Sequence, residues 1–134
     1  MGVVIYTCSK LKEAMADDAL QILVKNFREY KETGETKGIF GRDASYIRPS
    51  SAEFAKLQHV HIRDQKVKAS TWNNLRTASF YKVSNSAVVY VKGLRNNNKY
   101  LLLAVLNLNA HEMANNINFM CDLAEIAERF REQF

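Results

Sequence analysis

Proline is almost absent from this chain of 134 residues, which contains one proline, Pro49, and only five glycines. Linkers between domains are commonly rich in these two residue types, so their scarcity predicts a single domain over residues 1–134. Long apolar runs are also missing, and none approaches the roughly 20 residues that a membrane-spanning helix needs. We therefore expect one folded domain that does not cross a membrane.

Cysteine is scarce as well. The two cysteines, Cys8 and Cys121, lie far apart in the sequence and form no C-x-x-C pair. The first residues carry neither a basic stretch nor a long apolar one, so we expect no signal peptide. A cytoplasmic protein with reduced thiols is the interpretation that these features favour.

Acidic residues are outnumbered by basic ones, with 14 of the former and 19 of the latter, which gives a formal net charge of +5. The excess of positive charge is spread through the middle of the chain and is not confined to a tail. A folded basic domain attracts polyanions. Nucleic acid, the ribosome and acidic proteins are therefore the classes of partner to consider, although many soluble proteins are mildly basic.

The hydrophobic pattern predicts a helix toward each end of the chain. From Leu11, apolar residues recur every three to five positions until Gly34, a residue that can adopt the left-handed conformation that ends a helix. A second apolar stripe runs to the end of the chain. Its start at Asn109, with Glu112 three positions on, resembles a capping box.

Strands are predicted between the two helices, at residues 57–63, 78–83, 87–91 and 100–106. The last three are joined by short polar connections, which indicate antiparallel hairpins. Residues 100–106 contain a continuously apolar run, so we expect them to form the buried central strand. A short apolar segment at residues 3–7 is also β-prone.

Residues 34–56 show no sustained period and are predicted to form an ordered loop, with a short helical turn after Pro49. The complete pattern predicts an α+β fold. In this fold a small antiparallel sheet is packed by an N-terminal and a C-terminal helix.

Two histidines, His59 and His61, are two positions apart on a predicted strand, so their side chains should share one face. Histidine titrates near neutral pH, which makes the pair a candidate for acid/base catalysis. Two alternatives stay open. The histidines can simply lie on a half-exposed strand, or they can bind a metal together with His111. No acidic residue stands at a recurrent ligand spacing and neither cysteine is near, so we expect no metal and no other cofactor.

Arg42 and Asp43 follow a glycine in the predicted loop. The planar guanidinium of Arg42 suits a phosphate group, and Asp43 can orient a histidine or accept a proton. The alternative is a structural turn in which the two side chains form a salt bridge. His111 falls near the start of the last helix, where backbone N–H groups are available to a phosphate.

Further polar and aromatic residues are candidates for contact with RNA. Cations on or beside the sheet can bind phosphates, and an aromatic ring can stack on a base. A solvated sheet edge protected by lysines is the alternative. For Trp72, packing in the core or as a loop anchor is the preferred interpretation. The candidates for RNA binding are Arg76, Tyr81, Lys82, Lys92 and Lys99.

Several short segments also follow one another in the order and at the spacing of a known family. The first is F-x-x-Y-K-x-x-G, from Phe27 to Gly34. The others are residues 39–43, residues 59–62, Val89-Tyr90 with Gly93, residues 102–106, and His111, Ala114, Asn118, Met120, Ala124, Glu128, Phe130, Arg131 and Phe134. In this combination the chain resembles the YafO family of bacterial type II toxins.

Two features depart from the family pattern. The hairpin that commonly reads Arg-Thr-Ser/Asn-Asp in the family reads Lys82-Val83-Ser84-Asn85 here. If an arginine or an acid is needed in that hairpin, either the activity of this chain is weakened or another group takes over the role. The N-terminal strand, at residues 3–7, does not match closely.

The resemblance implies a ribosome-dependent mRNA endonuclease that a cognate antitoxin neutralises, with a fold similar to the RelE/ParE-like toxins. We expect the antitoxin to contain an acidic segment that covers the face carrying the histidines or displaces the last helix. The chemistry expected is attack of a ribose 2′-OH on the adjacent phosphate, without a metal. His59 and His61 would serve as acid and base, Arg42 would bind the phosphate and Asp43 would orient a histidine, with His111 and Lys82 as further candidates.

Two other functions remain compatible with these residues. One is a non-catalytic basic module that binds RNA or the ribosome. The other is a toxin that acts on a protein target. Neither of them requires a catalytic histidine.

Overall fold

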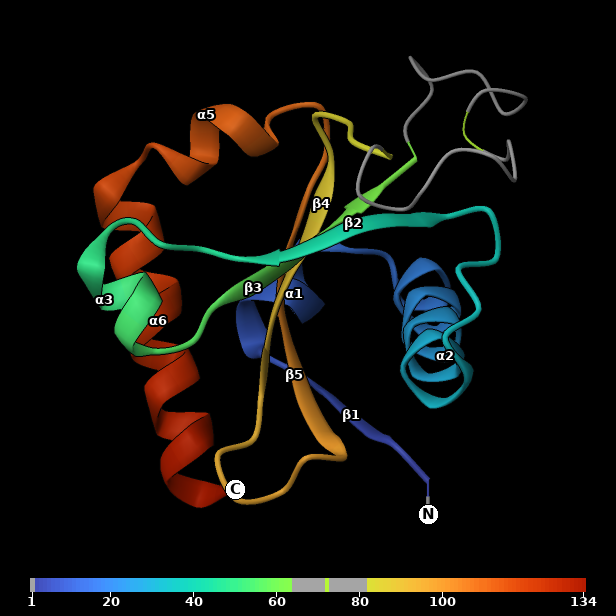
Figure 1. Ribbon diagram of the computed structural model, residues 1–134, viewed down its shortest axis with the longest axis horizontal. Helices are drawn as coiled ribbons and strands as arrows, with labels where there is room; N and C mark the ends of the chain where they lie inside the picture. The colour runs from blue at the N-terminus through green and yellow to red at the C-terminus, as the bar shows by residue number, and fades with distance from the viewer. Residues whose placement is uncertain (1, 64–71, 73–81) are drawn as a thin grey trace.

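The computed structural model describes residues 2–63, 72 and 82–134, and it has a five-stranded sheet with helices on both faces (Figure 1). The sheet order is β1-β5-β4-β3-β2. The strands are β1 (Val4–Thr7), β2 (Phe40–Ser45), β3 (Gln58–Ile62), β4 (Ala87–Lys92) and β5 (Lys99–Leu106). The helices are α1 (Ser9–Ala14), α2 (Asp17–Thr33), α3 (Ser50–Phe54), α5 (Ala110–Ala114) and α6 (Ile117–Gln133).

The predicted α+β class is confirmed, and so is the predicted antiparallel pairing of residues 87–91 with residues 100–106, which form β4 and β5. The pairs β2–β3 and β3–β4 are antiparallel as well. The fifth strand, β1, pairs with β5 in parallel, so the sheet is mixed. The prediction that residues 100–106 form the central strand is wrong, because β4 occupies the centre. Residues 87–91 of β4 are all buried.

The sheet separates two hydrophobic cores (Figure 1). On one face, Val89 and Leu103 pack with Leu123 and Ala127 of α6. On the other face, β4 and β5 pack with α1 and α2 around Phe27, which is 0% exposed. Because both faces are covered, β5 has no polar face, which explains its continuous apolar run.

The single N-terminal helix predicted from Leu11 to Gly34 is wrong in one respect. The chain is extended at Met15 (φ −121°, ψ 146°) and Ala16, and this break separates α1 from α2. Asp17 and Asp18 then lie in the first turn of α2, where a carboxylate is favourable to the helix dipole. The predicted end is confirmed, since Gly34 adopts a left-handed conformation at φ 82°.

The C-terminal helix is also divided, into α5 and α6. Asn109 occupies the predicted cap position, but its side chain makes no capping hydrogen bond. Instead, Asn116 caps α6, and its side chain accepts a hydrogen bond from the Phe119 N–H at 3.0 Å. None of the described helices combines the length and the apolar character needed to cross a membrane.

Strand β2 lies in the segment that was predicted to be a loop. Its register with β3 shifts between Phe40 and Asp43, which removes the strict alternation by which a strand is recognised in a sequence. At Gly41, a Cβ atom would lie 2.2 Å from the carbonyl oxygen of Lys82, so only glycine allows this close approach. Of the strand predicted at residues 78–83, residues 78–81 lie outside the described residues, and Lys82 and Val83 are not in a strand.

Candidate active site

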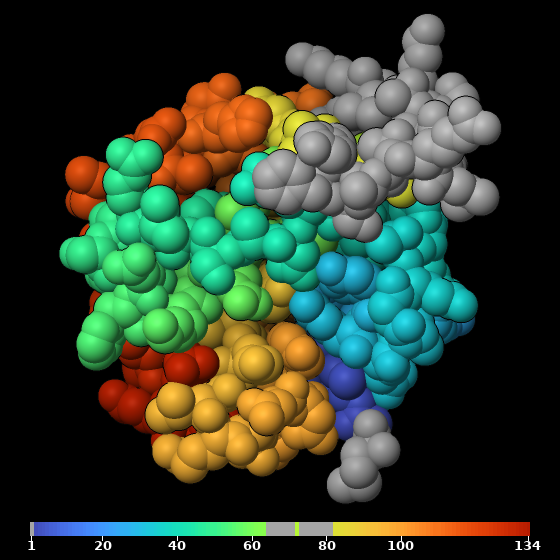
Figure 2. All heavy atoms as spheres, viewed as in Figure 1, coloured from blue at the N-terminus to red at the C-terminus, as the bar shows by residue number. Residues whose placement is uncertain are grey.

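All three histidines of the chain line one pocket, together with Arg42. Its volume is about 440 Å³, and its walls come from β2, β3, α5 and the chain that follows β2. The ring centroids of His59 and His61 are 5.5 Å apart, and those of His61 and His111 are 6.5 Å apart. In Figure 2, α5, in orange, borders the teal surface formed by β2 and its continuation toward α3. Four of the candidate residues are thus brought together.

The strand geometry explains this arrangement. Val60 is buried in the core against α2, so the flanking His59 and His61 lie on the opposite face of β3. In the sheet, Ala44 of β2 is paired with His59 and Ala87 of β4 with His61. These two alanines leave space beside the imidazole rings.

His59 is stacked on Tyr46, with ring centroids 4.2 Å apart and an angle of 22° between the planes. Its Nδ1 is buried and has no hydrogen-bond partner within the described part of the chain. Burial, followed by the neighbouring His61, lowers the pKa of His59 to about 4. His59 is therefore neutral at pH 7. Burial also raises the pKa of Tyr46 to about 12, so the phenol keeps its proton.

His61 is 7% exposed and contacts the backbone of Ser84. Its Nδ1 lies 2.8 Å from the Ser84 carbonyl oxygen and 3.1 Å from the Ser84 nitrogen. With the proton on Nδ1, the ring donates to the carbonyl and Nε2 keeps a lone pair that can accept a proton. Burial lowers the pKa of His61, and the hydrogen bond to Ser84 opposes this effect.

Asn85 connects the β3–β4 side of the pocket to α5. Its side-chain oxygen accepts a hydrogen bond from the His111 N–H at 2.8 Å, and its amide nitrogen donates to the Leu108 carbonyl at 2.9 Å. Ser84 and Asn85 therefore position His61 and His111, a role that the sequence did not reveal. The same amide lies 3.4 Å from the carboxylate of Glu112, where an aspartate would be repelled. This contact gives a reason for asparagine in place of the family's usual acid.

Asp43 lies in a different network and makes no hydrogen bond to a histidine among the described residues. It accepts hydrogen bonds from Tyr30 Oη at 2.8 Å, Tyr90 Oη at 2.6 Å and Lys31 Nζ at 3.0 Å. The structure thus places Asp43 between β2 and α2, and the predicted contact with an imidazole is not formed. The charge of Asp43 still acts on His59, whose pKa it raises against the dominant effect of burial.

The F-x-x-Y-K-x-x-G segment is explained by this network. Phe27 is in the core, Tyr30 and Lys31 bind Asp43, and Gly34 ends the helix. The ammonium of Lys31 also lies 4.9 Å from the centroid of the Tyr30 ring, a distance typical of a cation–π contact. These residues connect α2 to β2.

The proposed salt bridge between Arg42 and Asp43 was the basis of the structural-turn alternative. The cation that pairs with Asp43 is Lys31, at 3.0 Å. Arg42 is connected to the neighbouring segment through its backbone, whose N–H donates to the Lys82 carbonyl at 2.9 Å. Arg42 is also one of the residues that line the histidine pocket. The backbone connection does not depend on the identity of the side chain.

The remaining candidates are not all near the pocket. The backbone of Lys82 lies beside Gly41 and Arg42. Lys92 and Lys99 lie at the other end of β4 and β5, and Lys99 Nζ lies 4.4 Å from the centroid of the Phe134 ring. The structure does not bring these two lysines to the histidines.

Arg76 and Tyr81 lie outside the described residues. Trp72 is 2% exposed and packs close to Gly41, as expected for an anchor. Among residues 2–63, 72 and 82–134, no group of three or more His, Cys, Asp or Glu side chains has an arrangement that could hold a metal ion.

Comparison with known proteins decides the family. The family described as "Toxin YafO, type II toxin-antitoxin system" matches residues 28–132, which include every residue named above as lining the pocket. The chain belongs to the YafO family. This confirms the resemblance found in the sequence and makes the protein a type II toxin, a class that has an antitoxin partner.

A full-length relative supports the same assignment. The mRNA interferase toxin YafO of Escherichia coli (strain K12) is 25% identical over 134 residues, covering 97% of this chain and 98% of the relative. No solved structure matches the chain. Similarity of this YafO-family fold to the RelE/ParE-like toxins therefore stays a prediction.

The low pKa of His59 predicts that the protein is less stable in acid. An unfolded histidine binds a proton below about pH 6.5, whereas His59 in the folded state stays neutral down to about pH 4. The free energy of unfolding should therefore fall as the pH drops through this window, by at most about 2 kcal/mol at pH 5 from His59 alone. Urea denaturation at pH 7 and pH 5 measures the change.

His59→Phe is the matched variant for this measurement, because it retains a ring to stack on Tyr46 and removes the titrating group. Its loss of stability between pH 7 and pH 5 should be smaller than that of the unmodified protein. Equal losses in the two proteins would contradict the burial effect assigned to His59.

Proposed function

We propose that this YafO-family toxin is an endoribonuclease that cleaves mRNA through attack of a ribose 2′-OH on the adjacent phosphate. The observation that carries the proposal is the convergence of Arg42, His61 and His111 on one pocket. The relative named mRNA interferase toxin supports mRNA as the substrate. The reaction uses protein side chains alone and needs no metal.

The reaction requires a base, an acid and a cation. In the tautomer with the proton on Nδ1, His61 donates from Nδ1 to the Ser84 carbonyl and accepts the proton of the 2′-OH at Nε2. The 2′ oxygen bonds to phosphorus, and the bond from phosphorus to the 5′ oxygen breaks. His111, which is exposed on α5, gives a proton to the leaving 5′ oxygen. The products are a 2′,3′-cyclic phosphate and a 5′-OH.

Arg42 stabilises the charge that develops on the non-bridging phosphate oxygens, since a guanidinium can donate two parallel hydrogen bonds.

His59 is assigned a positioning role. With a pKa of about 4 it is neutral at pH 7, so it is not the charged imidazolium that acts as a general acid. It lies between Tyr46 and His61, where it supports the His61 ring.

Ribosome dependence is part of the proposal. Among the described residues that line the pocket, Arg42 is the one with a permanent positive charge. One positive charge is not enough to hold an RNA strand in the alignment that in-line attack requires. The ribosome would supply the missing alignment by holding the mRNA.

Inducible expression in bacteria tests this function, followed by mapping of new mRNA 5′ ends. Two copies of one reporter are compared, and they differ only in whether the start codon is intact. New ends should appear in the translated copy alone. Growth arrest without new ends in either copy would favour a protein target or a non-catalytic binding module.

Arg42→Lys separates the phosphate role from a structural role. Lysine keeps the charge and the backbone hydrogen bond to Lys82 but lacks the planar pair of donors. We expect mRNA cleavage to fall about 10²- to 10³-fold, the size of effect of losing one transition-state hydrogen bond. The melting temperature should stay within about 2 °C of the unmodified protein. A drop in melting temperature with activity proportional to the folded fraction would contradict the phosphate role.

A further inference from the structure

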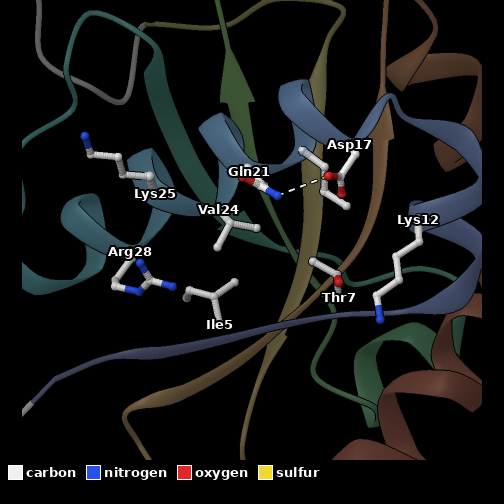
Figure 3. Close-up of a pocket in the computed structure, with 9 residues that line it drawn as sticks. Ile5, Thr7, Lys12, Asp17, Gln21, Val24, Lys25 and Arg28 are labelled. Carbon is white, nitrogen blue, oxygen red and sulfur yellow. Dashed lines mark hydrogen bonds between the residues drawn. The ribbon is translucent and has the colours of Figure 1, made fainter.

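A second hollow lies far from the histidines, between α2 and the outer edge of β1 (Figure 3). Its volume is about 390 Å³. Ile5, Leu20 and Val24 give it an apolar floor, and basic side chains surround this floor. We call it the β1 groove, lined by Ile5, Thr7, Lys12, Asp17, Leu20, Gln21, Val24, Lys25 and Arg28.

The strand that borders the groove has an open edge. Among the described residues, β1 is paired on one side only, with β5. The Val4 N–H donates to Asn98 and the Cys8 N–H donates to Leu102, so these residues direct their backbone groups toward β5. In a parallel pair, alternate residues face opposite edges, so the backbone groups of Ile5 and Thr7 face outward. An open edge of this kind can accept an added strand.

The charge of the groove indicates what would bind there. Lys12 and Arg28 lie on either side of Ile5 and Val24, and Lys25 lies on α2 with its ammonium directed away from β1 (Figure 3). The carboxylate of Asp17 accepts a hydrogen bond from the Gln21 amide at 3.1 Å. The groove therefore has an excess of positive charge beside an apolar strip and a row of backbone donors and acceptors.

Two other occupants fit less well. A second copy of this chain, with a net charge of +5, would bring like charges together at the edge. An RNA strand would place phosphates over Ile5, Leu20 and Val24 and near a carboxylate. An extended acidic peptide with alternating apolar side chains matches the floor, the cations and the strand edge at the same time.

We propose that the β1 groove binds an acidic, extended segment of the cognate antitoxin, which adds to β1 as a further strand. This site lies at the opposite edge of the sheet from β2, and so away from the histidine pocket (Figure 1). It anchors the antitoxin without filling the pocket. It is distinct from the surfaces expected from the sequence, and it does not depend on the chemistry of mRNA cleavage.

The test uses the antitoxin itself, identified as the product of an adjacent reading frame that restores growth when co-expressed. Lys25→Glu/Arg28→Glu reverses two groove charges, and Lys10→Glu/Lys56→Glu reverses two exposed charges elsewhere. The groove variant should bind the antitoxin at least about tenfold more weakly, remain toxic and resist rescue. The control variant should bind and be rescued normally. Equal affinities for the two variants would overturn the proposal.

Amide hydrogen exchange on the unmodified toxin gives a second readout that needs no substitution. Addition of the antitoxin should slow exchange at the amides of Ile5 and Thr7, because an added strand accepts hydrogen bonds from them. Unchanged exchange at both amides would overturn strand addition.

If the groove variant keeps its affinity for the antitoxin but loses toxicity, the groove contacts RNA or the ribosome and the proposal fails. Growth arrest without mRNA cleavage would contradict the proposed endoribonuclease function, but it would leave the proposal about the β1 groove intact.

Discussion

Replacing His61 with alanine is expected to abolish toxicity and to lower mRNA cleavage about 10²- to 10⁴-fold, the range typical of losing a general base. The side chain lies between His59 and His111 in the pocket, and its Nδ1 contact with Ser84 leaves Nε2 available. The rate of appearance of new mRNA 5′ ends, at matched protein levels, measures the loss.

Two comparisons separate catalysis from folding. His61 is buried, so the melting temperature of His61→Ala must be measured to show that the variant is folded. Tyr46→Phe is the matched control, because it keeps the ring that stacks on His59 and should retain cleavage within about threefold. The cleavage activity of His59→Ala should lie between those of His61→Ala and Tyr46→Phe, because this variant removes the ring that supports His61. A His61→Ala protein that remains toxic at equal expression would remove His61 from the reaction.

Replacing Asp43 with alanine should lower the free energy of unfolding by about 3 kcal/mol. The substitution leaves the Tyr30 and Tyr90 hydroxyls and the Lys31 ammonium without their shared acceptor. Burial raises the pKa of Tyr90, so this phenol stays protonated and cannot serve as a replacement charge. Urea denaturation at pH 7 measures the difference.

Asp122→Ala is the control for Asp43→Ala, because it removes an exposed carboxylate that lies 3.9 Å from Lys10. Exposed ion pairs contribute little, so its effect should be below about 1 kcal/mol. If Asp43→Ala lost cleavage but matched Asp122→Ala in stability, Asp43 would have a role in the chemistry and not in the connection of α2 to β2.

Local sequence patterns were sufficient for part of this structure. The alternation around Val60 predicted that His59 and His61 share a face, and Gly34 predicted the end of α2. Each depends on neighbours within a few positions along the chain. The amphipathic pattern could not show the breaks at Met15 and Asn115, since apolar residues continue on both sides of each break.

The parts that sequence reasoning missed depend on contacts between distant residues. Strand β2 was missed because a register shift removes its alternation and because its glycine is explained only by the approach of Lys82. Asp43 was expected to orient a histidine. Its partners are Tyr30, Lys31 and Tyr90, the last of them 47 positions away. No local pattern specifies such a set.

The segment at residues 82–85 shows that a family pattern, like a local sequence pattern, does not reveal contacts between distant residues. Its departure from the usual residues suggested a weakened site. In the structure the backbone of Ser84 holds His61, and Asn85 holds the start of α5 through His111. A backbone contact is insensitive to side-chain identity, and Asn85 suits the nearby Glu112. The replacement of the family's residues is therefore compatible with an assembled pocket.

The chemistry of the cleaved ends tests the central claim most directly. RNA is isolated after induction of the toxin, and new 5′ ends are ligated to an adaptor with and without prior kinase treatment. Attack by the 2′-OH predicts 5′-OH ends that ligate only after the kinase step, and their loss in His61→Ala. Ends that ligate without kinase carry a 5′-phosphate, the product typical of a metal-bound hydroxide, and would contradict the account.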